Sequence, residues 1–383
     1  MKKPINVLQI ALSLVFGGTE KLVYDIVRHV DKHKVRPVVC CLDEFGHFGE
    51  VLKNDGRQVY QLHRVPGVDW TLIPKLYHII QDERIDVIHA QQYTPYFYGL
   101  LASLYCKLRG AVYRPKLVFT EHGIAFPYRK KWKRRLVNPF LSLFTHEIIA
   151  ISQSLKENLA IYENFPTHRI KVIYNGIDLQ RFSLDIDPAV KKRSIGISHD
   201  GPLIGIVARL HHVKNHPLLL RAFKNVLEHA PQASLLIVGD GPDEDKLKRL
   251  ALSLELGEKA VFLGARDDIP ELLQVFDIFV LPSFSEGTSV SLLEAMASSL
   301  PIVATRVGGN SEVVIDQETA FLVESDNEDE MAAMILKLLF DEELRHRMGK
   351  AGRKRVHELF SLENMVKTYT DVYYKAVDGK RSS

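Results

Sequence analysis

Short apolar runs rich in β-branched residues alternate with segments of helical periodicity along almost the whole 383-residue chain. Continuous apolar strands separated by helices are typical of a parallel sheet that is covered on both faces. In the first half the predicted strands lie at residues 5–11, 36–43, 58–63, 86–91, 116–123, 146–152 and 170–176. In the second half they lie at residues 202–210, 234–241, 260–265, 278–283, 301–309 and 319–323. The pattern predicts an α/β protein.

The alternation stops once, in the polar stretch 178–200, and then restarts. We therefore expect two Rossmann-like, doubly wound domains, at residues 1–180 and 201–360, joined by a linker at 181–200. The amphipathic stretch 361–377 predicts a final helix, and the sequence leaves open which domain it packs on. A return to the N-terminal domain is one option. In such sheets ligands bind beyond the carboxyl ends of the strands.

Composition excludes several classes of protein. A net charge of +3 does not by itself indicate nucleic-acid binding. The longest apolar run, residues 5–18, is too short for a membrane span and has no signal-peptide cleavage site. Cys40, Cys41 and Cys106 lack C-x-x-C spacing, so neither a zinc site nor a disulfide framework is indicated. We expect a cytoplasmic protein, with contact to the cytoplasmic membrane face as a further option.

The segment "SEGTSVSLLE" at residues 285–294 carries Glu286 and Glu294 around the start of a predicted helix. One interpretation is helix capping, because Ser291 with Glu294 and Ser283 with Glu286 both fit the capping-box spacing. The other is a binding site, because a glycine turn that leads into a helix N-terminus attracts anions. The spacing alone favours capping.

Two loops carry further candidates. "FGGTEK" at residues 16–21 places Gly17 and Gly18 between the first strand and the first helix, where backbone N–H groups can approach a ligand closely or simply form a tight turn. "ARLHHVKN" at residues 208–215 places Arg209 at a strand end and Lys214 before a helix. An Arg fork with a Lys point charge suits a diphosphate, although either residue alone is more often a solvated cation.

His122, in "TEHGIAF", ends a predicted strand at the ligand edge of the first sheet. A histidine there can bond a sugar hydroxyl or share a proton, or it can be satisfied by backbone groups. Residues 129–135, "RKKWKRR", carry six basic residues around Trp132. This segment indicates either an anionic membrane or acceptor contact, or a solvated helix face. Nucleic acid is less favoured, because no aromatic stacking platform accompanies it.

Several motifs follow one another along the chain: "FGGTE", "EHG", "YNGID", "VGDGP", "FLG" and "SEGTSVSLLEAMASSLPIVATRVGG". Together they resemble the retaining glycosyltransferases of family 4, which have the GT-B fold of two Rossmann-like domains facing a central cleft. Glu286 and Glu294 match the family's E-x7-E motif. The resemblance covers roughly residues 5–375 and is stronger in the second half, as expected if the first half binds a variable acceptor.

The resemblance implies a role for each motif residue. Glu286 would hold hydroxyls of the donor sugar, and Glu294 would accept hydrogen bonds from the ribose. Arg209 and Lys214 would clamp the diphosphate and neutralise the leaving group in place of a metal. His122 would lie near the donor sugar. These roles make His122, Glu286, Arg209 and Lys214 the expected catalytic residues.

The turn at residues 264–266 matches the region that packs the nucleobase, and Gly17 and Gly18 match the loop facing the phosphate and the acceptor. The expected donor-binding set is Gly17, Gly18, Arg209, Lys214, Gly264, Ala265, Arg266, Glu286, Gly287, Thr288, Ser289, Val290 and Glu294. The chain departs from the family at Thr288, Ser289 and Val290, where many members carry an apolar residue followed by proline or asparagine. The hydroxyls there leave the identity of the donor sugar open.

We therefore expect a retaining, metal-independent glycosyltransferase with no cofactor, which moves a sugar from a UDP- or GDP-sugar to a glycan or lipid-linked glycan. The expected context is polysaccharide or glycoconjugate biosynthesis. Two alternatives remain: a nucleotide-sugar epimerase on the same fold and a non-catalytic sugar-binding module. Isomerisation of the sugar nucleotide without release of the nucleoside diphosphate would favour the epimerase. The sequence does not name the sugar, the base or the acceptor.

Overall fold

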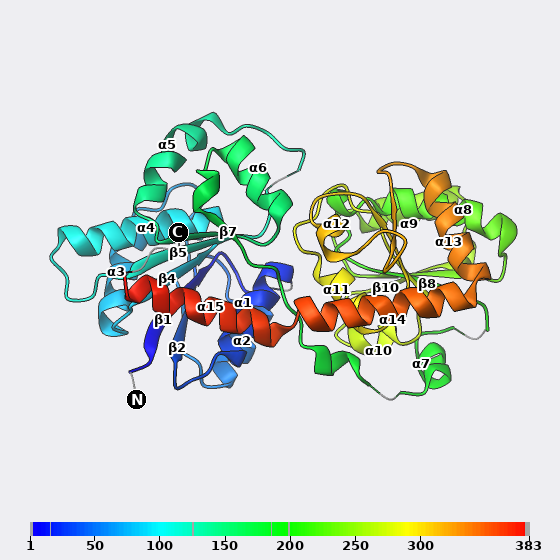
Figure 1. Ribbon diagram of the computed structural model, residues 1–383, viewed down its shortest axis with the longest axis horizontal. Helices are drawn as coiled ribbons and strands as arrows, with labels where there is room; N and C mark the ends of the chain where they lie inside the picture. Colours follow the sequence, from blue (N-terminus) through cyan, green and yellow to red (C-terminus); the bar gives the residue numbers. More distant parts are fainter. Residues whose placement is uncertain (1–2, 16, 125, 185, 198–199, 380–383) are drawn as a thin grey trace. The chain divides into compact units, whose positions relative to one another are not determined.

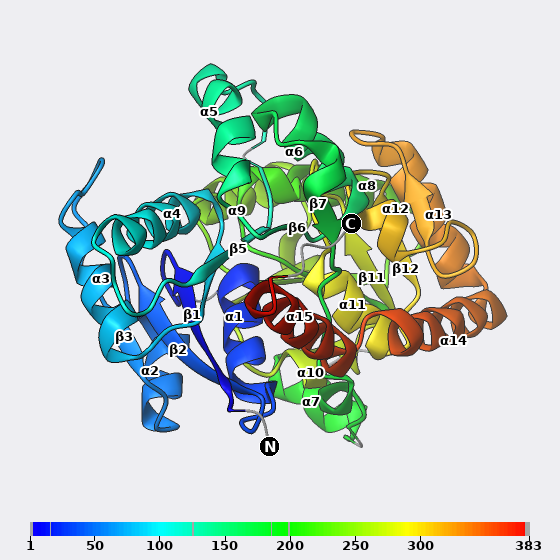
Figure 2. The ribbon, with the colours of Figure 1, turned by 60° about the vertical axis from the view of Figure 1, so that its left-hand side comes forward.

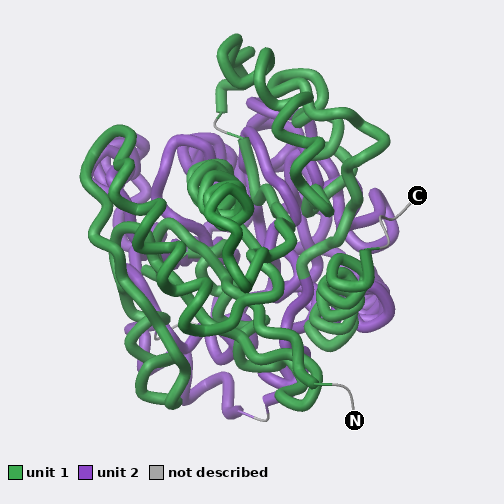
Figure 3. The backbone as a smooth tube through the Cα atoms, turned by 90° about the vertical axis from the view of Figure 1, so that its left-hand side faces the viewer, with its two compact units in different colours: residues 1–175, 362–383 green, residues 176–361 purple. Residues whose placement is uncertain are grey.

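The computed structural model describes residues 3–15, 17–124, 126–184, 186–197 and 200–379. The chain divides into two compact units, residues 1–175 with 362–383 (unit 1) and residues 176–361 (unit 2), coloured separately in Figure 3. The predicted linker, 181–200, lies within unit 2 and includes a short helix. Each unit contains one sheet, and all neighbouring strands in both sheets are parallel (Figure 1).

The sheet of unit 1 has the strand order β3-β2-β1-β4-β5-β6-β7, and each strand lies within or next to a predicted run. Its strands are β1 (Ile5–Ala11), β2 (Val35–Cys41), β3 (Val59–Gln61), β4 (Val87–Gln91), β5 (Lys116–Glu121), β6 (Glu147–Ala150) and β7 (Ile170–Val172). Its helices are α1 (Gly18–His29), α2 (Gly46–Asn54), α3 (Leu72–Asp82), α4 (Tyr93–Leu108), α5 (Trp132–Leu143), α6 (Gln153–Glu163), the 3-10 helix η1 (Thr167–Arg169) and α15 (Leu362–Val377).

Helices cover both faces of this sheet, as the unbroken apolar strands require. Apolar residues of α3, α4 and α6 pack on one face. Residues of α1, α2 and α15 pack on the other face, and Figure 2 shows α15 beside α1. Cys40 and Cys41 belong to clusters on opposite faces, as the period of a strand predicts. The last helix of the chain therefore completes the core of the first unit.

The sheet of unit 2 has the order β10-β9-β8-β11-β12-β13. Its strands are β8 (Leu203–Val207), β9 (Ser234–Val238), β10 (Ala260–Gly264), β11 (Ile278–Leu281), β12 (Ile302–Thr305) and β13 (Phe321–Val323). Its helices are η2 (Leu179–Phe182), α7 (Pro188–Ser194), η3 (His212–Lys214), α8 (His216–His229), α9 (Glu244–Ser253), η4 (Gly257–Lys259), α10 (Ile269–Leu273), α11 (Val290–Ala297), α12 (Asn310–Val313), α13 (Glu328–Phe340) and α14 (Glu342–Leu359). Apolar residues of α8, α9 and α13 cover one face.

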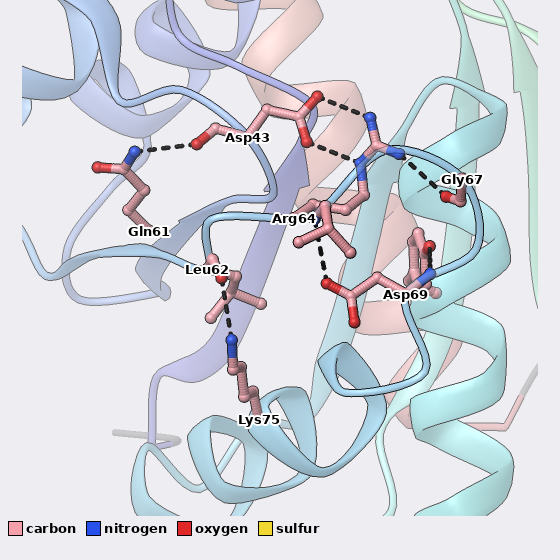
Figure 4. A network of polar contacts seen from close by, with 9 residues as sticks. Asp43, Gln61, Leu62, Arg64, Gly67, Asp69 and Lys75 are labelled. Atoms are coloured by element: carbon pink, nitrogen blue, oxygen red, sulfur yellow. Dashed lines mark hydrogen bonds and ion pairs between the residues drawn. The ribbon is translucent and has the colours of Figure 1, made fainter.

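The loop between β3 and α3, residues 62–71, is held by polar contacts at the carboxyl end of the first sheet (Figure 4). The guanidinium of Arg64 donates to both carboxylate oxygens of Asp43, over 2.7 and 2.8 Å. Asp69 accepts from the backbone N–H of Val65 and of Thr71. The loop is therefore ordered by its own side chains, while Trp70 remains 63% exposed.

Each sheet reverses its strand order once, between β1 and β4 in unit 1 and between β8 and β11 in unit 2. Such a switch point leaves a crevice at the carboxyl ends of two neighbouring strands, because their following loops diverge to opposite faces. The two switch points are therefore the places in each unit where a ligand is expected. None of the helices in the described part of the chain combines the length and apolar content needed to cross a bilayer.

Candidate functional site

The switch point of unit 2 brings Lys214 and Glu286 together. Lys214 lies in the loop after β8, and Glu286 lies in the loop after β11. The Lys214 ammonium donates to Glu286 Oε1 over 2.6 Å, and the Ser283 hydroxyl donates to the same oxygen over 2.6 Å. The Glu286 side chain is 8% exposed. Two predicted site residues thus form one charged pair at the expected edge of the sheet.

Backbone contacts fix the position of the Glu286 loop. The N–H of Phe284 donates to the carbonyl of Val213 over 2.8 Å, which ties this loop to the one that carries Lys214. The N–H of Gly309 donates to the Glu286 carbonyl over 3.0 Å. At Gly308, with φ +49°, an added Cβ would lie 2.1 Å from that same carbonyl oxygen. The close approach therefore requires glycine at this position.

Neither glutamate acts as predicted by the capping interpretation. The N-cap of α11 is Ser289, whose hydroxyl accepts from the N–H of Leu292, so the capping box of Ser291 with Glu294 is wrong. Ser283 caps no helix, and its hydroxyl donates directly to Glu286. Glu294 lies in the second turn of α11 and is half-buried.

The segment between the glutamates is largely buried. Thr288 and Ser289 are each 5% exposed, and Ser289 is engaged as the helix cap. Gly287 and Val290 are half-buried beside them. The Ser289 hydroxyl therefore serves the helix, because the first turn of α11 needs an acceptor for its N–H groups.

Arg209 lies beside Lys214 in the loop after β8 and is exposed. The turn "VGDGP" packs under this loop. A Cβ at Gly239 would lie 2.1 Å from the carbonyl oxygen of Ala208, and one at Gly241 would lie 2.3 Å from that of Leu210. The two glycines therefore let the backbone of one loop support the backbone of the next.

Three histidines that follow β8 in the sequence flank a pocket of about 250 Å³. His211, His212 and His216 line it together with Asp243 and Phe284. Burial lowers the pKa of His216 to about 4, so this imidazole is neutral at neutral pH. Within the described residues, no group of three or more His, Cys, Asp or Glu side chains is arranged to hold a metal ion.

The predicted nucleobase turn ends β10, on the edge strand of unit 2. Gly264 has φ +67°, and Ala265 follows it. The guanidinium of Arg266 donates to both oxygens of Asp268, over 2.8 and 2.6 Å. Because its fork is occupied by Asp268, Arg266 contributes to the turn mainly through its backbone and its ion pair.

In unit 1, the switch point lies beside the predicted glycine loop. Gly17 is the N-cap of α1 and Gly18 its first residue, and both are exposed directly after β1. Gly17 has no side chain, so the N-cap residue supplies no side-chain acceptor to the first N–H groups of α1. The position fits an anion or a polar ligand.

His122 follows β5 and is half-buried. Its Nε2 lies 2.7 Å from Oε1 of Gln91, at the end of β4. Burial lowers the pKa of His122 to about 3, so the ring is neutral at neutral pH. The preceding Glu121 is 4% exposed, and burial, followed by the charge of Glu163, raises its pKa to about 7.

Three further polar residues near His122 were not predicted: Gln9, His89 and Gln91. They lie at the carboxyl ends of β1 and β4 and are at most 1% exposed. Their signal in the sequence is a polar residue inside an otherwise apolar strand, with His89 and Gln91 two residues apart and hence on one face. Such buried polar positions need partners, which makes them candidates for a functional network.

The basic segment is only partly available as a surface. Arg134 donates to the buried carboxylate of Glu163 over 2.8 Å, and Lys131 lies 3.6 Å from the same group. Arg135 donates to the carbonyl of Ile161. Lys131, Arg134 and Arg135 therefore contact groups within unit 1. Arg129, Lys130 and Lys133 are the exposed members.

The chain matches two family descriptions that together cover most of its length. Residues 16–181 match "Glycosyltransferase Family 4", and residues 189–355 match "Glycosyl transferases group 1". It is 30% identical over 343 residues to N-acetyl-alpha-D-glucosaminyl L-malate synthase of Bacillus anthracis, covering 86% of this chain and 84% of that protein. It is 29% identical to the UDP-Gal:alpha-D-GlcNAc-diphosphoundecaprenol alpha-1,3-galactosyltransferase of Escherichia coli, covering 82% and 81%.

Solved structures show the same fold. Anabaena HepE, crystallised in complex with UDP-glucose, superimposes with a TM-score of 0.84 at 22% identity, over 97% of this chain and 100% of that one. The matched family regions include β2–β7 and β8–β13, and the relatives cover more than two thirds of the chain. The chain therefore belongs to the glycosyltransferases of the family 4 and group 1 type and has the GT-B fold.

Proposed function

We propose that this glycosyltransferase transfers a sugar, with retention and without a metal ion, from a UDP- or GDP-sugar to a glycan or lipid-linked glycan. The contact between Lys214 and Glu286 carries the proposal. It joins a cation and a carboxylate at the switch point of unit 2, where the fold binds ligands. A sugar diphosphate needs both groups, one for its phosphates and one for its hydroxyls.

The donor class is supported by the relatives. The Escherichia coli relative is named as a UDP-galactose enzyme, and HepE was crystallised with UDP-glucose. Lys214 and the exposed Arg209 would neutralise the charge of the nucleoside diphosphate as it leaves. In metal-dependent enzymes a bound metal ion does this. On donor binding, Lys214 would exchange part of its contact with Glu286 for a phosphate oxygen.

The two glutamates would then have separate ligands. Glu286, in the loop after β11, would accept hydrogen bonds from hydroxyls of the transferred sugar. Glu294, in α11, would accept from the ribose. The turn at 264–266 would pack the base through its backbone, since Arg266 is occupied by Asp268. His122 of unit 1 would meet a sugar hydroxyl.

The acceptor proposal rests on helix α5. Trp132, Leu136 and Phe140 are between 61% and 73% exposed and follow one another every four residues, so they form an apolar stripe. Exposed Lys130 and Lys133 flank it. An apolar stripe with basic flanks suits the interface of an anionic membrane, where a lipid-linked acceptor resides.

Calorimetry with bare UDP and GDP tests the donor site. Lys214→Ala and Arg209→Ala should each weaken nucleotide binding by about 1.5–3 kcal/mol, as expected for loss of a charge-assisted hydrogen bond. Lys354→Ala removes an exposed lysine of α14 and should leave the affinity unchanged. Unchanged affinity in both site variants would overturn the proposed donor site.

Product analysis tests the reaction. The enzyme is incubated with a panel of UDP- and GDP-sugars. It should release nucleoside diphosphate only when acceptor is present, and it should form an α-linked product from an α-linked donor. The activity should persist in excess EDTA. Isomerisation of the donor without release would establish an epimerase instead. A strict need for Mg²⁺ or Mn²⁺ would remove the metal-independent mechanism.

A further inference from the structure

A buried polar chain runs through unit 1 and ends at His122. Its members lie on β1, β4, β5 and α15, on the face of the sheet that α15 covers. In the register of the sheet, Gln9 pairs with His89, and Gln91 pairs with Thr120. Because side chains two residues apart share a face, all four lie on one side of the sheet. Tyr373 of α15 completes the chain.

Hydrogen bonds orient the two glutamine amides in this chain. Gln9 Nε2 donates to the hydroxyl of Tyr373 over 2.9 Å, so the oxygen of Gln9 is the end that faces Gln91. Gln91 Nε2 donates to Gln9 Oε1 over 2.9 Å. The remaining end of Gln91 is its oxygen, which lies 2.7 Å from His122 Nε2.

Burial makes the opposite orientation costly. Gln9 and Gln91 are each 1% exposed, and Tyr373 is fully buried. Rotating the Gln91 amide would place its oxygen against the oxygen of Gln9 and remove the acceptor of His122. The free-energy cost of two unpaired polar groups in a site without water exceeds the net stabilisation from either hydrogen bond. Reversing both amides together would keep these bonds, but it would make Nε2 of His122 an acceptor and leave a shielded Nδ1–H without an acceptor among the described residues. The orientation described above is therefore the one that leaves no ring N–H of His122 unpaired.

An amide oxygen can only accept, so this contact requires a proton on Nε2 of His122. The neutral ring carries a single proton, which leaves Nδ1 with a free lone pair. Nδ1 is shielded from water and has no hydrogen-bond partner among the described residues. A buried acceptor without a donor is unusual in a folded protein and points to a ligand that supplies one.

We infer that Gln91 is a positioning residue which, held by Gln9 and Tyr373, fixes His122 as the Nε2–H tautomer so that Nδ1 accepts a hydrogen bond from a sugar hydroxyl. This inference rests on the proposed function, in which His122 meets the sugar. Beyond that role, Nδ1 is the ring nitrogen that contacts the sugar, it accepts a hydrogen bond from a hydroxyl group, and Gln91, Gln9 and Tyr373 fix the tautomer.

Nitrogen-15 NMR of the histidine-labelled protein tests the tautomer directly, without any substrate. The His122 signals are assigned by their loss in His122→Asn. We expect the Nε2–H tautomer in the wild type and a mixed population in Gln91→Leu. Gln61→Leu is the matched control, because Gln61 also ends a strand of this sheet but bonds the Asp43 carbonyl. The Nδ1–H tautomer in the wild type, or an unchanged tautomer in Gln91→Leu, would overturn the inference.

Two substitutions of His122 give a second test that stands even if Gln91→Leu does not fold. Asparagine places an acceptor oxygen near the position of Nδ1, whereas glutamine extends its amide toward Nε2. We expect His122→Asn to turn over about tenfold faster than His122→Gln, the ratio for one hydrogen bond. Rates that are reduced equally in the two variants, or a faster His122→Gln, would contradict the inference. If both variants match the wild-type rate while the tautomer is as inferred, the proposed role of His122 fails and the geometry stands.

Discussion

Glu286 is held at both its carboxylate and its carbonyl. The carboxylate accepts from Lys214 and Ser283, and the carbonyl accepts from the N–H of Gly309. A side chain held this fully has the preorganisation that the proposed contact with the donor sugar requires. Its position differs from that of Glu294, which lies on the helix itself, and the two carboxylates can be tested separately.

Glu294→Gln should weaken the binding of bare UDP or GDP by about 1–3 kcal/mol, because the ribose is part of both nucleotides. Glu286→Gln should leave bare nucleotide binding within about twofold and reduce turnover by a factor of 10² or more, because its proposed ligand is the transferred sugar. Calorimetry and turnover of the same preparations measure both effects. Full activity of Glu286→Gln would remove the residue from the site.

Gly308→Ala should disable the site through the backbone. The new Cβ would meet the Glu286 carbonyl oxygen at 2.1 Å, so the loop must move. Gly257 is the matched control: its φ of +52° is close to that of Gly308, +49°, but its Cβ would meet no atom within 4 Å. Gly257→Ala should cost about 1 kcal/mol of stability and spare turnover. Equal turnover in the two variants would contradict the role of the close approach.

Glu121 gives unit 1 a pH-dependent stability with a defined sign. Its folded pKa, about 7, lies above its ordinary 4.5, so the folded protein keeps a proton that the unfolded chain loses. Stability from this group is therefore present below about pH 4.5 and is lost as the pH rises to about 7. His122 has the opposite sign: its folded pKa of about 3 means that stability is lost as the pH falls from 6.5 toward 3.

Glu121→Gln removes the first of these effects while keeping an acceptor for the N–H of His122. Relative to the wild type, the variant should gain stability between about pH 5 and about pH 8, by up to a few kcal/mol. Denaturant unfolding at both pH values measures the difference. A stability difference that does not change with pH would show that Glu121 is ionised in the folded protein.

At the scale of elements, the basic residues of α5 differ in their surroundings, because Lys133 is exposed whereas Arg134 contacts Glu163. Arg134 compensates Glu163, which is 2% exposed, and its guanidinium lies 3.5 Å from the centre of the Tyr93 ring. Removing Arg134 would leave the buried Glu163 carboxylate to the longer contact with Lys131, at 3.6 Å, and destabilise the unit. A test of membrane binding must therefore leave it in place and change only outward side chains.

The triple variant Trp132→Ser, Leu136→Ser and Phe140→Ser should lose binding to liposomes that contain anionic lipid. A second variant, with Arg129, Lys130 and Lys133 changed to Ser, should weaken it by roughly 1 kcal/mol per residue and reduce its dependence on salt. Leu252→Ser with Phe340→Ser is the matched control, since these side chains are 72% and 67% exposed on α9 and α13. Binding by neither the wild type nor any variant would favour a water-soluble acceptor.

At the scale of the whole molecule, unit 1 depends on the end of the chain. Helix α15 contributes Met365, Tyr369 and Tyr373 to the core beneath β1, β4 and β5. The unit is therefore assembled from both ends of the sequence, and it can be complete only after residues 362–377 have been made.

Tyr369→Ala should destabilise unit 1 by about 3–5 kcal/mol, as truncation of a buried aromatic side chain does, and leave unit 2 folded. Lys367→Ala, on the exposed side of the same helix, should change stability by less than about 0.5 kcal/mol. Hydrogen exchange resolved by peptide distinguishes the two units. Loss of protection in β8–β13 together with β1–β7 would show that the units unfold as one.

The sequence by itself determined the secondary structure, the parallel sheets and the loops that carry the site, because strand and helix periods are local properties of the chain. The same reasoning placed Arg209, Lys214 and Glu286 on loops at strand ends. It failed for the capping boxes, because which hydroxyl caps α11 depends on where the helix begins.

The tertiary structure alone decided which side chains meet. Lys214 and Glu286 are 72 residues apart, and Gln9 and Tyr373 are 364 apart. Their contacts follow from the order of strands in each sheet and from the return of α15, which no local period encodes. The same applies to Lys131, Arg134 and Arg135, which resemble their exposed neighbours in sequence and turn inward only because α6 supplies a carboxylate and a carbonyl. Burial, which sets the protonation of Glu121 and His122, exists only once these elements have packed.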